Sequence, residues 1–471
     1  MILTENKKIF FALFAVFMVF YTVQIPFHTS KSDIIIFAIR AMDDKPILDY
    51  AFLNSGTLLE GSALPNYHLG HTLVLWLIYQ IVPASLFNTI WPAGLVSAIS
   101  GALIVALTFL IWKSLNIEKY KAIAIAVVVG LIPSIWEQSI IGEVYAMQLM
   151  FILLFVYAFI KDKIILSALA FLFANLVSPL SALSFGLLLL KPFSKKTFRN
   201  ATIIGSISLF LYIGIYSIIG ANLLDLFSPL ATEQDGRGII YRSGMLVIFL
   251  VLNFNFFIFY LFKGVQQSLK NENKKILFLV LATIPQLLLL FLGSTFFIEL
   301  GSFQLPIFWA LAFPLGLYLS QINFRRVSFI SASVGLIVLA NLLWILPNAT
   351  IGASRVEAGN WLKGNGYQEN CIIGSWDTSI GVMIGKNNCT IETLNKNYID
   401  NASPTNDDIL KTNKNNLVIA EQKKPLLRTF LAKLKIPGMG INLYDPKKEI
   451  KNGIISKLYE NDSVLLYNWE K

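Results

Sequence analysis

Apolar residues in this chain are gathered into blocks of about 20 residues, and polar stretches separate the blocks. About 20 apolar residues cross a bilayer as an α-helix, so the blocks have the length of membrane spans. Lysine and arginine stand at the ends of many blocks, which is typical of cytoplasmic loops. The pattern therefore predicts a mainly α fold, a polytopic membrane helical bundle.

The order of the basic clusters predicts the topology. The block at residues 9–27 ends without a small-residue cleavage pattern, so we expect a retained first helix with a cytoplasmic N-terminus. Residues 67–83 form a short block that Gln80 interrupts, which favours an interfacial segment over a spanning one. With that choice every dense basic cluster falls inside. About eleven spans are then expected, at residues 9–27, 88–112, 121–136, 145–160, 164–177, 179–190, 201–219, 243–262, 276–293, 304–320 and 328–346.

Two domains follow from this topology. Residues 1–346 form a membrane domain whose longest outer loop is 28–87, and residues 347–471 form a tail outside the cytoplasm. Alternating apolar positions predict that the tail is a small α/β extracytoplasmic domain. Its expected elements are a helix at 353–363, strands at 371–374, 389–393 and 416–420, and a hairpin of 454–459 with 463–468.

The tail holds both cysteines of the chain, Cys371 and Cys389. On an oxidising side of the membrane they can form a disulfide, which would stabilise the fold by roughly 3 kcal/mol. Two reduced and buried thiols are the alternative. The sequence leaves both states open.

Composition narrows the function. Charged residues make up 14% of the chain, against roughly 25% in soluble domains, and the mean hydropathy is +0.64. The net charge of +10 lies mostly between apolar blocks, so contact with lipid head groups explains it better than a nucleic-acid partner. No phosphate loop, dinucleotide fingerprint or Cys/His zinc spacing is present. An enzyme of this kind must take an activated substrate from the lipid or from the outer aqueous phase.

The first outer loop carries several candidate site residues. Asp33 opens an apolar stretch, where a carboxylate either caps a helix or acts as a partly desolvated general base. Arg40 lies about two helical turns later. His68 and His71 share a face if the segment is helical, and they could bind a phosphate or a divalent metal. Packing at the interface is the alternative for both histidines.

The second outer loop places Glu137 and Glu143 near the ends of apolar blocks, with Tyr145 just beyond. Ionisable groups at such places are candidates for function. Glu137 can also be read as a solvated loop residue, whereas apolar residues surround Glu143. Both carboxylates are thus candidates, and Glu143 is the stronger one.

A third outer loop, residues 220–242, contains Arg237 and Arg242. The guanidinium fork matches the oxygens of a lipid-borne phosphate. Snorkelling anchors at the membrane interface are the alternative for these two residues.

These motifs, in this order, resemble the GT-C superfamily of glycosyltransferases, in its protein O-mannosyltransferase-like and lipid A aminoarabinose transferase-like branches. Asp33 followed by IIIFAIRAM resembles the acidic motif after the first span, although Ile34 replaces a common Glu. Ser178 likewise stands where a His is common. The segments that carry the likeness over residues 10–190 are LPNYHLGHTLVLWLIYQIVP, AGLVSAISGALIVALTFLIW, WEQSIIGEVYAMQLMF and ANLVSPLSALSFGLLLL.

The resemblance implies sugar transfer, typically with inversion, from a polyprenyl-phosphate donor to an acceptor protein, lipid or glycan on the outer face. It implies that Asp33 is the base or positions the acceptor, and that Glu143 helps bind acceptor or donor. The absence of Glu at position 34 leaves metal use open, and no other cofactor is implied. We assign binding of the donor phosphate or the substrate to His68, His71, Arg237, Arg242, Arg40 and Tyr145.

Two other classes of protein are alternatives. A transporter or flippase of lipid-linked sugars needs polar residues deep in several spans or inverted repeats, and the sequence shows neither. A non-catalytic GT-C-like scaffold would present the outer domain without needing Asp33 or Glu143. The sugar, the lipid carrier and the acceptor are not specified by the sequence pattern.

Overall fold

The computed structural model describes twelve segments, together with the positions 37, 41, 283–285 and 354. The segments are 4–25, 68–82, 91–219, 239–254, 257–270, 304–320, 357–362, 364–367, 371–374, 416–422, 454–462 and 464–470. The chain divides into two compact units. The first comprises Met1–Val23, Tyr67–Val74 and Gly94–Leu342, and the second comprises Gln24–Asn66, Leu75–Ala93 and Leu343–Lys471.

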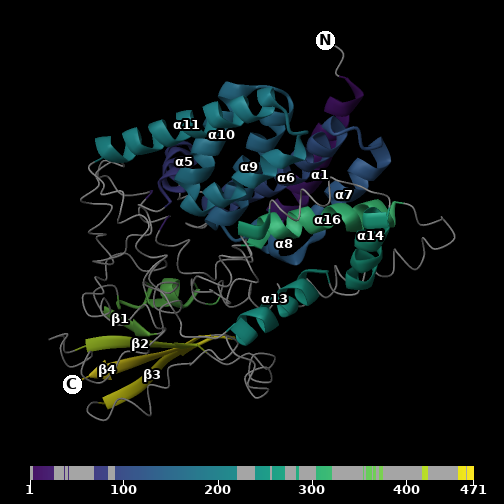
Figure 1. Cartoon of the computed structure of the whole chain (residues 1–471). Coiled ribbons are helices and arrows are strands. Elements are labelled where there is room, and N and C mark those ends of the chain that lie inside the picture. Colours follow the sequence, from purple (N-terminus) through teal and green to yellow (C-terminus); the bar gives the residue numbers. More distant parts are fainter. Residues whose placement is uncertain are drawn as a thin grey trace. The chain divides into compact units, whose positions relative to one another are not determined.

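The first unit is helical (Figure 1). Its elements are α1 (Glu5–Thr22), the start of α5 (Leu69–Ile81), most of α6 (Trp91–Ser114), α7 (Lys119–Leu131), α8 (Pro133–Gln138), α9 (Val144–Ile160), α10 (Ile164–Val177), the 3-10 helix η3 (Pro179–Leu190), α11 (Lys195–Ile218), α13 (Ile239–Phe254), α14 (Ile258–Lys270) and α16 (Leu305–Leu319).

Large aromatic side chains fill the core of this unit. The ring of Trp112 stacks on those of Trp309 and Phe313, at centroid distances of 5.6 and 4.0 Å. Trp309 also donates a hydrogen bond from Nε1 to Thr108 Oγ1 at 2.9 Å. These contacts join α6 to α16. The hydrogen bond gives the buried indole N–H an acceptor, and without one the buried group would destabilise the fold.

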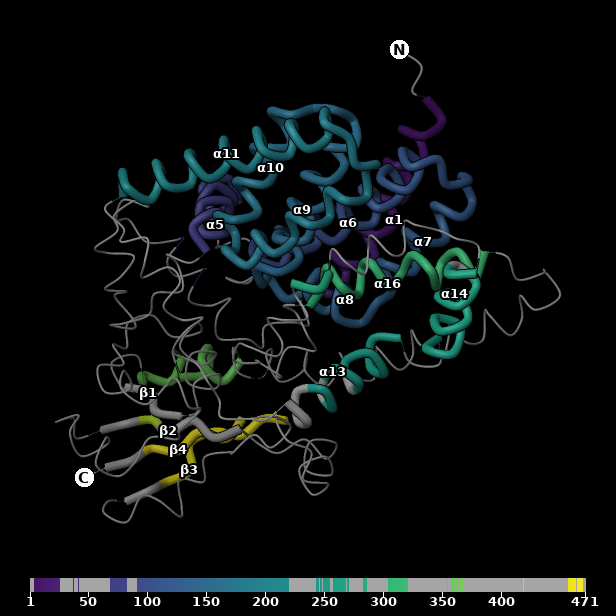
Figure 2. Tube along the Cα trace, viewed as in Figure 1, coloured from purple at the N-terminus to yellow at the C-terminus, as the bar shows by residue number. Residues whose placement is uncertain are grey.

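Apolar side chains on α10 and α11 face outward. The tube in Figure 2 shows α10 between α9 and α11, and α10 packs against both. The outer face of α11 carries Leu209, Phe210 and Ile218, which are all exposed. In water such a face would be unfavourable, so it indicates contact with lipid.

The described apolar helices differ in whether they are long enough to cross a membrane. Among the described helices, α6 and α11 have both the length and the hydropathy of a membrane span. The other apolar helices, including α9, α10 and η3, are shorter. The expected count of eleven spans therefore stays a prediction. Two of the expected spans, 276–293 and 328–346, lie outside the described residues.

Helix boundaries largely follow the sequence prediction. The expected helices 164–177 and 179–190 match α10 and η3, but η3 is a 3-10 helix. A 3-10 helix rises about 2.0 Å per residue, against 1.5 Å in an α-helix. Its 12 residues thus cover about 24 Å rather than about 18 Å. The 3-10 form lengthens a segment that would be short for a span.

Two expected helices are interrupted. The span 121–136 is divided into α7 and α8 at Ile132, whose backbone is extended, because Pro133 lacks an N–H and restricts the residue before it. The span 243–262 was predicted as one helix, which is wrong, since α13 ends at Phe254 and α14 begins at Ile258. Near the end of α13, the Asn253 side chain donates to Phe249 O and accepts from the backbone N–H of Ser134. Such side-chain bonds compete with helical hydrogen bonding.

The second unit contains a four-stranded sheet in the order β1-β2-β4-β3. Its strands are β1 (Cys371–Gly374), β2 (Asn416–Gln422), β3 (Ile454–Glu460) and β4 (Val464–Glu470). β1 pairs parallel with β2, whereas β4 is antiparallel to both β2 and β3. The strands predicted at 371–374 and 416–420 and the hairpin are confirmed, and the strand predicted at 389–393 lies outside the described residues.

A small hydrophobic core supports this sheet. Helical residues 357–362 place Ala358 and Leu362 against Val418, Val464 and Leu466, and all five are buried. Rings stack beside this core, since Trp361 lies 6.0 Å from Tyr367 and 5.0 Å from Tyr459 between centroids. The arrangement is α/β, as the alternation in the tail predicts.

Candidate active site

The buried carboxylate of Glu143 marks the N-terminus of α9. Gly142, with φ +82°, turns the chain, and Glu143 is the extended residue that precedes the helix. Glu143 is 2% exposed. Its side chain does not cap α9, and its backbone oxygen accepts a hydrogen bond from Ser97 Oγ at 3.2 Å. Helix capping therefore does not account for the position of this carboxylate.

The turn between α8 and α9 packs tightly against α6. A Cβ atom on Gly101 would lie 2.1 Å from Ser139 Oγ, so only glycine allows this approach. The Ser139 hydroxyl itself donates to Ile135 O at 2.6 Å. Glu137 is also buried, so the reading of Glu137 as a solvated loop residue is wrong. Close packing by α6 removes water from the loop that the sequence suggested was open.

The start of α5 reaches the end of α10. His68 Nδ1 lies 2.6 Å from Val177 O, and since a carbonyl oxygen can only accept, Nδ1 carries the proton. A Cβ atom on Gly70 would lie 3.0 Å from the backbone of Leu176 and Val177, so the two segments are in direct contact. The histidine and the glycine together fix the start of α5 beside the turn that leads into η3.

His71 connects α5 to the Glu143 turn. Its imidazole is fully buried and interacts with the backbone of Gly142 and with the ring of His68. Burial disfavours a charged ring, so His71 would act as a neutral hydrogen-bonding group or metal ligand rather than as a cation. The structure thus brings His68, His71 and the Gly142–Glu143 turn together. Tyr145, in the first turn of α9, is also buried.

The side chains of the other predicted site residues are not among those that the structure describes. Asp33, Arg40, Arg237 and Cys389 lie outside the described residues. Arg242 belongs to α13 and Cys371 to β1, but only their backbones are described. Their assigned roles, including the disulfide, stay predictions. In the described ranges no three His, Cys, Asp or Glu residues gather closely enough to hold a metal ion, and metal binding by His68 and His71 also stays a prediction.

One residue of this region had no role in the sequence analysis. Gln138 is fully buried, and within the part of the chain that the structure describes neither atom of its amide has a hydrogen-bond partner. An unsatisfied buried polar group costs about 1–3 kcal/mol, and it is frequently explained by a ligand or water. Its adjacency to Glu137 was the available signal, but burial could not be read from the sequence.

Comparison with known proteins shows the fold. No family model and no curated protein matches the sequence. ArnT from Cupriavidus metallidurans, solved in the apo state, is similar with a TM-score of 0.57 and 12% identity, over 99% of this chain and 98% of that one. The oligosaccharyltransferase AglB from Archaeoglobus fulgidus, in complex with an inhibitory peptide and a dolichol-phosphate, has a TM-score of 0.52 and 11% identity, over 88% of this chain and 70% of that one. The likeness shows that this chain has the fold shared by ArnT and AglB.

Proposed function

We propose that this protein is a membrane glycosyltransferase that moves a sugar from a polyprenyl-phosphate donor to an acceptor on the outer face. The observation that carries the proposal is the buried Glu143 at the start of α9, joined to His71 through the Gly142 turn, in a chain with the GT-C fold. A carboxylate removed from water at a helix end is costly unless it serves binding or chemistry. The N-terminus of α9 partly offsets that cost, because its dipole favours an anion.

Asp33 and Glu143 have different tasks in this proposal. Asp33 removes the proton of an acceptor hydroxyl while the hydroxyl oxygen attacks the anomeric carbon of the donor. The bond from that carbon to the phosphate oxygen breaks, the phosphate keeps the electron pair, and the configuration inverts. Glu143 orients the acceptor or the sugar. The leaving phosphate needs no strong acid, and cationic or hydrogen-bonding groups such as Arg237 and Arg242 stabilise it.

The donor class is supported by the AglB structure, which holds a dolichol-phosphate. A polyprenyl tail remains in the bilayer, so a bundle with outward-facing apolar helices suits such a substrate. Sugar hydroxyls would also satisfy the amide of Gln138, which can donate and accept. The acceptor class, whether protein, lipid or glycan, is not narrowed further.

Transfer assays separate this proposal from its alternatives. Purified protein is incubated with a panel of radiolabelled polyprenyl-phosphate sugars and a membrane extract, and label is sought in protein, lipid and glycan fractions. We expect covalent transfer from at least one donor, and we expect Glu143→Gln to reduce it. A flippase would move labelled donor across reconstituted vesicles without covalent transfer, and a scaffold would do neither.

A further inference from the structure

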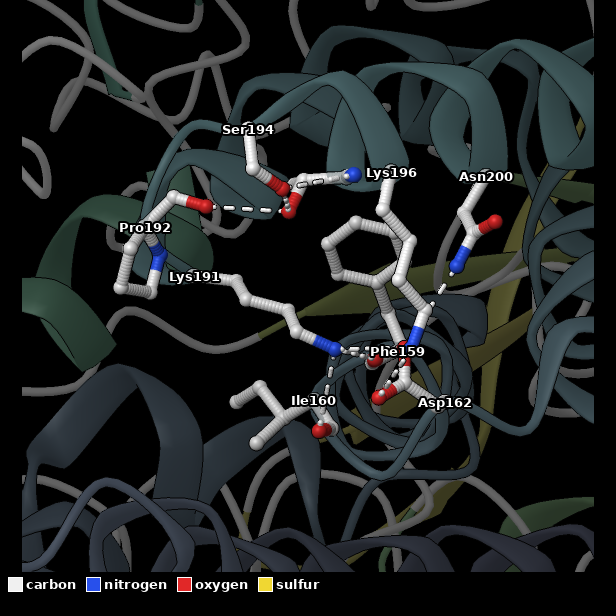
Figure 3. Close-up of polar contacts among 9 residues, drawn as sticks. Phe159, Ile160, Asp162, Lys191, Pro192, Ser194, Lys196 and Asn200 are labelled. Atoms are coloured by element: carbon white, nitrogen blue, oxygen red, sulfur yellow. Dashed lines mark hydrogen bonds and ion pairs between the residues drawn. The ribbon is translucent and has the colours of Figure 1, made fainter.

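A second polar cluster lies at the far end of α9 from Glu143. The turn between α9 and α10 and the segment between η3 and α11 meet there, around Asp162 (Figure 3). Lys191 Nζ lies 2.7 Å from Asp162 Oδ1, and Lys196 Nζ lies 3.6 Å from Oδ2. Asn200 Nδ2 donates to the same carboxylate at 3.4 Å. One carboxylate thus holds two basic segments side by side.

Lys191 also ties this cluster to the end of α9. Its ammonium group lies 3.3 Å from Phe159 O and 3.4 Å from Ile160 O, two of the carbonyl groups at the helix C-terminus. A cation at that place complements the helix dipole. Lys191 is therefore occupied by structural contacts, and the remaining basic residues supply the charge for any partner.

The charge of the two segments is strongly unbalanced. Residues 159–165 and 190–200 contain six basic residues and a single acidic one, Asp162. Lys161, Lys163, Lys195 and Arg199 are all exposed. Because one carboxylate faces two ammonium groups, an excess of positive charge is left at this surface. A partner of negative charge would be attracted to it.

Exposed aromatic rings accompany that charge. Phe193 is 75% exposed and Phe198 is 61% exposed, and their rings lie 6.2 Å apart. Ile165, at the start of α10, is 74% exposed. Basic groups beside exposed aromatic and aliphatic side chains are typical of surfaces that enter the boundary between lipid head groups and acyl chains.

The basic loop between α6 and α7 has a smaller excess, because Lys113, Lys119 and Lys121 stand against Glu118 and, from α1, Glu5. Lys119 pairs with Glu5 at 2.7 Å, and Lys121 pairs with Glu118 at 2.9 Å. Each of these two lysines has a carboxylate of its own. Charge density therefore distinguishes the segments around Asp162 from the loop between α6 and α7.

We propose that the surface formed by Lys161, Lys163, Phe193, Lys195, Phe198 and Arg199, here termed the basic corner, docks on the head groups of anionic lipids. The ammonium and guanidinium groups contact lipid phosphates, and the two phenylalanine rings lie at the acyl boundary. The partner is a bilayer surface rather than the donor lipid, so the inference is independent of the proposed sugar transfer.

Thermal unfolding in detergent tests the proposal. Full-length protein is titrated with phosphatidylglycerol or with phosphatidylcholine, and the midpoint concentration of the lipid-induced Tm shift is recorded. We expect a larger shift with phosphatidylglycerol. Replacing Lys161, Lys195 and Arg199 by Gln should raise the midpoint concentration about fivefold for each removed charge, whereas Lys119→Gln with Lys121→Gln should leave it unchanged.

Further measurements keep the result interpretable if the triple variant unfolds. High salt should abolish the phosphatidylglycerol effect in the wild type, since exposed charges are screened. Phe193→Ser with Phe198→Ser should weaken the effect of lipid while leaving the charges intact. Equal shifts from the two lipids, an unchanged midpoint in the folded triple variant, or the same shift from inorganic phosphate alone would overturn the proposal.

Discussion

His68 Nδ1 lies 2.6 Å from the backbone oxygen of Val177, a residue 109 positions away in the chain. This bond fixes the start of α5 to the end of α10, beside the turn that leads into η3. His71, one turn later on α5, is thereby directed toward Gly142 and the Glu143 turn. The histidines that the sequence placed in one outer loop thus support a site built from three separate segments.

Removing the His68 bond should destabilise the protein. His68→Ala leaves Val177 O without its donor, which costs about 0.5–1.5 kcal/mol. His68→Asn is the matched control, because the amide nitrogen of Asn can replace Nδ1 as a donor. We expect a lower Tm for the Ala variant and a nearly native Tm for the Asn variant. Equal losses in the two variants would show that packing of the ring, and not the bond, matters.

Asp33 and Glu143 should affect different steps of the reaction. Asp33→Asn removes proton acceptance, so kcat should fall roughly 10²–10⁴-fold, as for a positioned general base. Glu143→Gln should mainly raise KM, since we assign it to binding. Steady-state kinetics with the donor identified by the transfer assay would measure both.

The controls for these variants address folding. Each substitution keeps the size of the side chain, so the Tm of both variants should remain close to that of the wild type. Ser97→Ala removes only the hydrogen bond to Glu143 O, and it should have a smaller kinetic effect than Glu143→Gln. Full activity of Asp33→Asn would contradict its role as the base and favour helix capping.

Gly316 should be intolerant of a side chain. A Cβ atom at this position in α16 would lie 2.7 Å from Ile125 Cα on α7, so Gly316→Ala forces the helices apart. Overpacking of this kind costs about 1–3 kcal/mol. Gly214→Ala in α11 is the matched control, since nothing lies within 4 Å of its Cβ position, and a more helix-favouring residue adds about 0.5–1 kcal/mol. In thermal unfolding, Gly316→Ala should have a lower Tm than the wild type, and Gly214→Ala should have an equal or slightly higher one. An unchanged Tm for Gly316→Ala would refute the close contact.

Acid should weaken the Asp162 cluster. The hydrogen bond from Lys191 holds the pKa of Asp162 below its ordinary value of 3.8, and the charges of Lys191 and Lys196 act in the same direction. Because the pKa of Asp162 is lower in the folded protein than in the unfolded chain, the ionised carboxylate stabilises the fold at any pH above the unfolded-state pKa. This stabilisation disappears as the pH falls through the folded-state pKa. The Tm of the wild type should therefore exceed that of Asp162→Asn at neutral pH, by a small amount because the carboxylate is partly exposed. The two curves should converge below pH 3.8, and parallel curves would exclude the ion pairs as the cause.

Cysteine labelling should establish the sides of the membrane. In a variant with Cys371 and Cys389 replaced by Ser, an impermeant maleimide should label Lys457→Cys in intact cells. Lys161→Cys should react only after permeabilisation, because the basic clusters are expected on the cytoplasmic side. Both positions are exposed, so access by water is not limiting. Labelling of Lys161→Cys in intact cells would reverse the predicted topology.

The sequence by itself determined the elements whose signals are local. The apolar runs and Pro179 located α10 and η3 to the residue, and alternation located β1, β2 and the β3–β4 hairpin. It also placed Glu143 near the start of the expected span 145–160, and the observed helix α9 begins one residue earlier, at Val144. These features follow from hydrophobic period and from the missing N–H of proline, which act within a few residues of the chain.

Only the tertiary structure decided which polar groups are buried together. Glu137 and Gln138 look like loop residues until α6 packs against the turn that follows them. The interactions of His68 with Val177 O and of His71 with the Gly142 backbone likewise join segments that are far apart in the chain. The Asn253 side chain, near the end of α13, also has a distant partner, the backbone N–H of Ser134, which is 119 residues away in the chain. Burial and long-range hydrogen bonds arise from the packing of distant segments, and no pattern within a single segment encodes them.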